Sequence, residues 1–241
     1  MVLLITFLAG LSILVGAAVT HISKDPAKIE HISIALALGA LLGLLLFDLR
    51  PDIGEFVGSS GWPVAVMMIA IGLAVLKILD MFVPDHEDTE ANHDKENALH
   101  IGVISSLAII LHNIVEGMTV YSLALASLQG GIVFAVGIAM HNIPMGMMIY
   151  TTLEGERKRA KLALLSSVTL STLVGGILMS LISEHLTETV IGALVCVAGG
   201  MILYIVFAEL IPHVIKTRQP LQSTVMAVCG FVLVYLSCML E

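Results

Sequence analysis

Residues 99–127 read LHIGVISSLAIILHNIVEGMTVYSLALAS, an apolar stretch interrupted by a few His, Asn and Glu residues. A helix needs about 20 mainly apolar residues to cross the hydrocarbon core of a bilayer, and this stretch exceeds that length. Similar stretches recur along the whole chain without the alternating pattern of a β-barrel. The sequence therefore predicts an all-α membrane protein with eight spanning helices, at residues 2–20, 32–49, 62–83, 99–127, 131–152, 162–183, 190–211 and 222–240.

The composition of the whole chain agrees with this interpretation. Of 241 residues, 58% are hydrophobic and only 12% are charged, whereas a soluble domain has about 25% charged residues. A net charge of −8 and the absence of a basic patch with aromatic residues exclude a nucleic-acid partner. Three cysteines without paired spacing predict neither a disulfide framework nor a CxxC metal site. We expect a multi-pass protein of the plasma membrane, or of the inner membrane in a bacterium.

The basic residues predict how the chain is oriented. With eight spans, ten of the 11 Lys and Arg residues fall on one side, in or beside the loops 21–31, 84–98, 153–161 and 212–221, and only Arg50 falls on the other. Cytoplasmic loops carry an excess of Lys and Arg. The charges therefore predict that both termini face outward.

Two internal repeats predict the architecture. Leu111–Ser122 (LHNIVEGMTVYS) matches Met140–Thr151 (MHNIPMGMMIYT) at an offset of 29 residues, and Gly39–Asp52 (GALLGLLLFDLRPD) matches Gly200–His213 (GMILYIVFAELIPH) at an offset of 161. The longer offset spans an odd number of crossings, so helices 1–3 and 6–8 would be inverted repeats around a central pair, as in many transporters. This 3+2+3 bundle divides the chain into 1–83, a cytoplasmic loop 84–98, the central helices 99–152, and 153–241. Chance similarity is the alternative for the Gly- and Leu-rich pair.

Polar residues of the fourth and fifth spans fall near mid-bilayer. Glu116 follows His112 by four residues and shares its helix face, while His141 reaches a similar depth from the opposite direction, with Asn113 and Asn142 beside the two histidines. A charged carboxylate at the bilayer centre costs a few kcal/mol. A divalent cation bound by imidazole and carboxylate would offset this cost, whereas interhelical hydrogen bonding is the alternative.

HNIVEG (112–117) and HNIPMG (141–146) resemble the helix-four and helix-five motifs of the ZIP (Zrt/Irt-like) metal transporters. The eight predicted spans, the outward termini and the 3+2+3 arrangement are also similar to that family. The resemblance implies that His112, Asn113 and Glu116 bind the metal from the fourth helix. It implies that His141 and Asn142 bind it from the fifth.

The chain departs from the family pattern at three places. Met145 replaces a Glu that commonly bridges two metals, Val115 replaces a proline, and the sixth span has TLVGG (172–176) where many relatives carry a further Glu. With two anionic ligands missing, we expect one metal at a time. Met145 is either a soft thioether ligand or a filler of the apolar core.

Further acidic residues predict a path through the membrane. Asp48 and Asp52 are placed near the outer end of the second span, and Glu209 and His213 near the inner end of the seventh. We expect the first pair to collect cations and the second to receive them; ordinary helix-end charges are the alternative. The acidic, His-containing loop at 84–98 is interpreted either as a weak metal-collecting segment or as a solvated linker.

These observations predict a transporter, not an enzyme, that moves divalent transition-metal cations through the His/Glu/Asn site. The resemblance implies movement into the cytoplasm and zinc as the main substrate, with iron, manganese and cadmium as others. The metal is substrate, and no catalytic cofactor is expected. Because a metal-binding His must be neutral, uptake should fall at acid pH. The partners are the metal cations and the lipid bilayer, and a homodimer is left open. An intramembrane zinc-dependent hydrolase and a non-transporting metal sensor are the alternative functions.

Overall fold

The computed structural model describes residues 1–22, 25–82, 93–153, 158–182, 187–217 and 219–239. These residues form helices and no strands, which confirms the predicted all-α class. In chain order the elements are α1 (Val2–His21), α2 (Pro26–Gly43), the π-helix η1 (Leu44–Leu49), α3 (Arg50–Ser60), α4 (Trp62–Asp80), α5 (His93–Ala126), α6 (Leu128–Thr152), α7 (Lys158–Ile182), α8 (Glu188–Tyr204), the π-helix η3 (Ile205–Leu210), α9 (Ile211–Lys216) and α10 (Pro220–Cys238).

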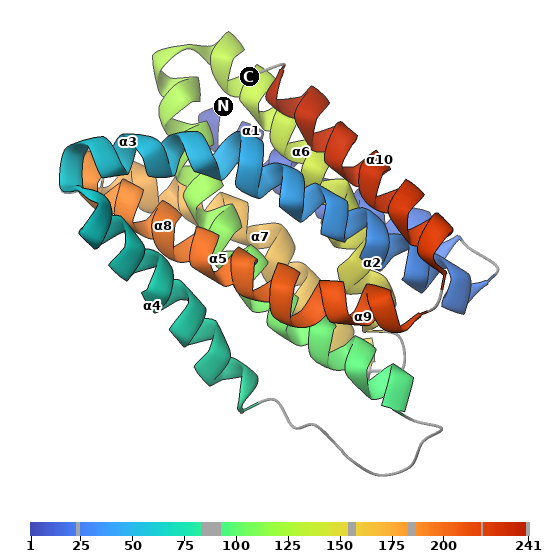
Figure 1. The fold of residues 1–241 in the computed structure, drawn as a ribbon. Helices are drawn as coiled ribbons and strands as arrows, with labels where there is room; N and C mark the ends of the chain where they lie inside the picture. Colours follow the sequence, from blue (N-terminus) through green and yellow to red (C-terminus); the bar gives the residue numbers. More distant parts are fainter. Residues whose placement is uncertain (23–24, 83–92, 154–157, 183–186, 218, 240–241) are drawn as a thin grey trace.

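Eight helices of the described part of the chain are long and apolar enough to cross a membrane, as predicted. Two of them are composite, because α2, η1 and α3 run on as one span, Lys28–Ser60, and α8, η3 and α9 as another, Glu188–Lys216. Figure 1 shows the helices side by side in a bundle, with α4 along one edge and α10 along another.

The second span is longer than the predicted 32–49. Pro51 does not end it, and the helix continues to Ser60. A proline lacks the N–H that would continue the ladder, and its ring collides with the preceding turn. Here the wider π-turn η1 precedes Pro51 and accommodates the ring, and η3 does the same before Pro212. The span therefore extends beyond its predicted end at residue 49, and Asp52 lies eight residues, or about 12 Å, before Ser60.

Small residues bring the helix backbones into close contact. A Cβ atom at Gly16 or Gly146 would collide with backbone of the opposite helix, at Ile143 and Ile13 respectively, so α1 and α6 pack closely. Small residues at helix interfaces are a main source of packing between membrane helices. The same kind of contact recurs between α5 and α7, where Gly117 meets Thr172 and Gly175 meets Ile114.

A second set of close contacts joins the outer helices. Gly39 of α2 meets Ala227 of α10, and Gly200 of α8 meets Ile69 of α4. When α2 is matched with α8 at the offset of 161 residues, Gly39 maps onto Gly200. When α4 is matched with α10 at an offset of 158 residues, Ile69 maps onto Ala227, so each of the two contacts maps onto the other. The π-helices also correspond at 161 residues, since Leu44–Leu49 maps onto Ile205–Leu210.

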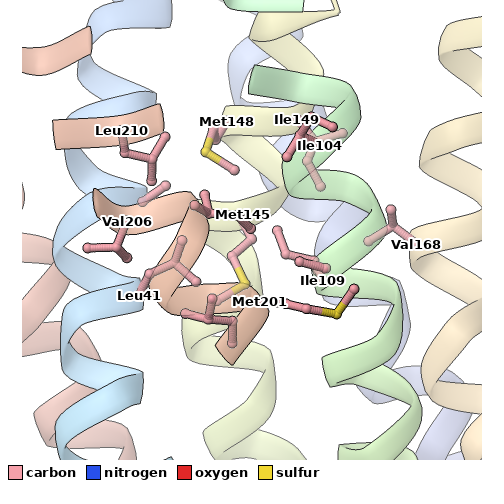
Figure 2. Packing of buried hydrophobic residues seen from close by; sticks show 14 of the residues in the cluster. Leu41, Ile104, Ile109, Met145, Met148, Ile149, Val168, Met201, Val206 and Leu210 are labelled. Atoms are coloured by element: carbon pink, nitrogen blue, oxygen red, sulfur yellow. The ribbon is translucent and has the colours of Figure 1, made fainter. Parts of the chain in front are cut away.

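Burial identifies the central helices of the bundle. In the most apolar window of each span, 72% of α5, 61% of α6 and 61% of the span Lys28–Ser60 is buried, but only 17% of α4 and 22% of α10. The main buried cluster includes Leu41 of α2, Ile104 and Ile109 of α5, Met148 of α6 and Leu210 of η3, as Figure 2 shows. The structure therefore places α5 and α6, which carry the predicted metal ligands, in the protein interior.

Candidate metal site

The predicted ligands His112, Glu116 and His141 meet between α5 and α6. The Oε1 atom of Glu116 lies 2.9 Å from Nε2 of His112 and 2.7 Å from Nε2 of His141. The i, i+4 spacing places His112 and Glu116 on one face of α5, and the packing of α6 brings His141 to the same carboxylate. One ligand atom from each of the three residues lies within 4.8 Å of the other two.

This group is withdrawn from the protein surface. The residue exposures are 1% for His112, 5% for Glu116 and 2% for His141. Among the described residues, Oε2 of Glu116 has no hydrogen-bond partner. A buried carboxylate with an unpaired oxygen is costly unless a positive charge compensates it. Two imidazoles and a carboxylate are typical ligands of Zn²⁺ and similar ions.

The two predicted asparagine ligands are fully buried beside the histidines. The side-chain amide of Asn113 donates a hydrogen bond of 3.4 Å to the Val168 carbonyl oxygen of α7, and its own oxygen has no hydrogen-bond partner among the described residues. Neither polar atom of the Asn142 side chain has such a partner. The structure thus leaves the amide oxygens of both asparagines available, and their role as ligands remains a prediction.

Met145 lies one turn beyond His141 on α6 and is fully buried. It belongs to the apolar cluster that also contains Leu41, Ile109 and Met201, and Figure 2 shows these side chains around it. These surroundings are typical of a core residue. They favour the filler interpretation, and a thioether bond to the metal remains an untested prediction.

Asp48 and Asp52 line a cavity together with two of the predicted ligands. The cavity measures about 240 Å³, and His112 and Glu116 form part of its wall. Asp52 is exposed and Asp48 is half-buried, so acidic side chains run from the protein surface toward the buried carboxylate. A larger hollow of about 580 Å³ between α2, α9 and α10 has no carboxylate or imidazole in its lining and is not suited to a cation.

Glu209, predicted as a residue of the path, belongs to a second group. One ligand atom each from Asp80, His100 and Glu209 lies within 4.8 Å of the others. Asp80 ends α4, His100 stands near the start of α5, and Glu209 lies in η3. Sequence analysis missed Asp80 and His100, although a carboxylate and an imidazole at facing ends of consecutive spans could have suggested them.

Two other predicted elements contribute less. His213 lies in α9, four residues beyond Glu209 in the same span. Most of the predicted loop 84–98 lies outside the described residues, and α5 begins at His93, before the predicted start of the fourth span at residue 99.

The chain is similar to known zinc transporters. The family model "ZIP Zinc transporter" matches residues 84–237. The chain is 33% identical to the zinc transporter ZupT of Chlorobium luteolum, over 87% of this chain and 86% of that protein. It is 26% identical to ZupT of Clostridium perfringens, over 100% of this chain and 95% of that protein. A match to ZupT of Chlorobaculum parvum, at 27% identity, spans about half of that protein, 52%.

Proposed function

Because the chain belongs to the ZIP family of zinc transporters, we propose that it moves zinc and similar divalent cations across a membrane into the cytoplasm. The observation that supports this most directly is the buried group of His112, Glu116 and His141 between the two central helices. Membership in a transporter family also makes the chain a transporter rather than an enzyme.

The geometry of the group suits one bound cation. Zinc ligands at 2.0–2.2 Å in a tetrahedral arrangement are separated from one another by about 3.4 Å. The separations of 2.9 Å and 2.7 Å from Glu116 to the two histidines need to open by only about 0.5–0.7 Å. One carboxylate shared by two imidazoles supplies a single negative charge. We therefore propose that one metal binds at a time, with an amide oxygen or water as the further ligand.

The surroundings of the site support a carrier that opens to one side at a time. On one side, the cavity with Asp48 and Asp52 reaches the central ligands. On the other side, the buried apolar cluster fills the space along α5 between His112 and His100, with Ile104 and Ile109. A cation that enters from the acidic cavity therefore meets a closed apolar barrier, and helix movement is needed before it can leave.

The proposed direction of movement rests on topology. We propose the 3+2+3 inverted repeat, with divisions 1–83, 84–98, 99–152 and 153–241 and both termini outside. The exchange of close glycine contacts between equivalent helices supports this arrangement, as do the equivalent π-helices. Under this topology the cavity with Asp48 and Asp52 faces outward, while Asp80, His100 and Glu209 lie toward the cytoplasm.

The experiment that tests the proposed function is zinc uptake into liposomes that contain the purified chain. We expect accumulation of radioactive zinc by the unaltered protein and its loss in Glu116→Gln, because the variant removes the negative charge that both histidines face. Glu188→Gln, at an exposed position in the first turn of α8, is the matched control and should transport normally. Binding of zinc without accumulation by the unaltered protein would instead favour the metal-sensor alternative.

A further inference from the structure

Asp80 is surrounded by three donors that come from different parts of the bundle. Its Oδ2 atom accepts hydrogen bonds from the Lys77 ammonium at 2.9 Å and the Tyr204 hydroxyl at 2.5 Å. Its Oδ1 atom lies 2.5 Å from Nε2 of His100. The two oxygens thus differ, since Oδ2 faces the Lys77 ammonium and Oδ1 faces the His100 imidazole.

The imidazole that faces Oδ1 of Asp80 also faces a second carboxylate. Nε2 of His100 lies 3.9 Å from Oε1 of Glu209. The side chains of Asp80, His100 and Glu209 are only 11%, 11% and 14% exposed. To reach the ligand separation of about 3.4 Å that a tetrahedral cation requires, His100 must move away from Asp80 by about 1 Å and toward Glu209 by about 0.5 Å. A small rotation of one imidazole would meet both requirements.

We propose that Asp80, His100 and Glu209 form a second, low-affinity site for a divalent transition-metal cation, and that the Lys77 ammonium competes with this cation for Asp80. The inference deepens the proposed function, since the site would receive the ion on its way to the cytoplasm. The bound ion takes the place between Asp80 and Glu209, and Lys77 weakens its binding so that the ion is released.

The charges of the cluster explain why the lysine has this effect. Two carboxylates attract a divalent cation, but Lys77 already neutralises one of them at 2.9 Å. When the metal binds, either the ammonium stays and repels it, or the ammonium must leave Asp80. The Lys77 side chain is 59% exposed, so it can leave toward solvent. It also lies 5.8 Å from the centre of the Tyr204 ring, which offers a nearby resting position.

The position of the cluster distinguishes it from the central site. His100 precedes His112 by 12 residues on α5, which corresponds to about 18 Å along the helix. The buried apolar side chains of Ile104 and Ile109 lie between these two histidines. The two groups are therefore separate, and one can be removed without direct contact with the other.

Zinc binding tests the proposal without any need for transport. The full chain with Glu116→Ala and His141→Ala, which disables the central site, is purified in detergent and its binding of radioactive zinc is measured by equilibrium dialysis. We expect one weak site to remain and to disappear on further change of His100→Ala. Adding Lys77→Gln should tighten it on the order of tenfold, because a neighbouring, partly screened positive charge is removed. Lys158→Gln removes an exposed charge elsewhere and is the matched control.

Two results would overturn the proposal. The first is residual zinc binding by the Glu116→Ala, His141→Ala variant that does not change with His100→Ala. The cluster would then only hold α4, α5 and η3 together. The second is an affinity that Lys77→Gln leaves unchanged. Size-exclusion profiles check that each variant folds, and Asp80→Glu, which keeps the carboxylate, must retain the site. Because the readout is binding, failure of zinc uptake by the unaltered protein would refute the proposed function separately.

Discussion

Met145 stands on α6 at the position that corresponds to Glu116 on α5, since the two differ by the repeat offset of 29 residues. His141 precedes Met145 by four residues, as His112 precedes Glu116. The change Met145→Glu would therefore give α6 the same pair of ligand types that α5 presents. Because Met145 is fully buried among apolar side chains, this change separates the cost of burying a carboxylate from the gain of a new ligand.

Without metal, Met145→Glu should be destabilising. A charged side chain at the centre of a membrane helix costs about 2.5–3.5 kcal/mol on insertion scales. At roughly 2–4 °C per kcal/mol for a chain of this size, Tm should fall by about 5–14 °C. Saturating zinc should restore most of this loss. A second anionic ligand contributes about 1.5–3 kcal/mol, so zinc affinity should rise about 10- to 150-fold.

The assay is thermal unfolding of the purified protein in detergent, with and without zinc, together with equilibrium dialysis. Met145→Gln is the matched control, because it has a similar size and polarity but no charge. It should be destabilised without any gain in zinc affinity. If Met145→Glu gains no more zinc affinity than Met145→Gln, the side chain at this position does not reach the metal. The inference that positions 141 and 145 of α6 correspond to His112 and Glu116 of α5 is then refuted.

Two other predictions concern the cavity and the packing. Asp48→Asn should raise KM for zinc uptake about three- to tenfold with little change in the maximal rate, because the carboxylate concentrates cations in the cavity; an equal effect of Glu55→Gln, outside the cavity lining, would argue against this role. Gly39→Ala should lower stability by about 1–3 kcal/mol, because its Cβ would collide with the Ala227 carbonyl oxygen. Thermal unfolding measures this loss, and Gly54→Ala, which meets nothing within 4 Å, should show none.

The eight spans and the meeting of three polar side chains between α5 and α6 were predictable because they depend on local sequence. A long apolar stretch is sufficient to indicate a membrane helix. The i, i+4 spacing fixes the relation of His112 to Glu116 without knowledge of any other helix. His141 was predictable because its motif repeats that of His112 and therefore falls at a similar depth. In the structure all three side chains meet at one carboxylate oxygen.

The remaining features depend on contacts between helices and could not be predicted in the same way. The predicted second span ended at residue 49, whereas the helix continues through the π-turn before Pro51 and carries Asp52 within the same span. The contacts of Asp80 with His100 and Tyr204 join residues 20 and 124 positions apart. No periodicity in the sequence records such a distance, and the signal that the sequence offered was a carboxylate and an imidazole at facing ends of consecutive spans.

The central claim is that two imidazoles and one carboxylate jointly bind a single cation between α5 and α6. X-ray absorption at the zinc edge tests this most directly, on protein loaded with less than one equivalent of zinc so that the tighter site fills first. The account predicts a shell of nitrogen and oxygen at about 2.0–2.2 Å with the scattering of two imidazoles, and loss of one imidazole in His141→Ala. A zinc shell without imidazole, or one that is the same in His141→Ala, would contradict it.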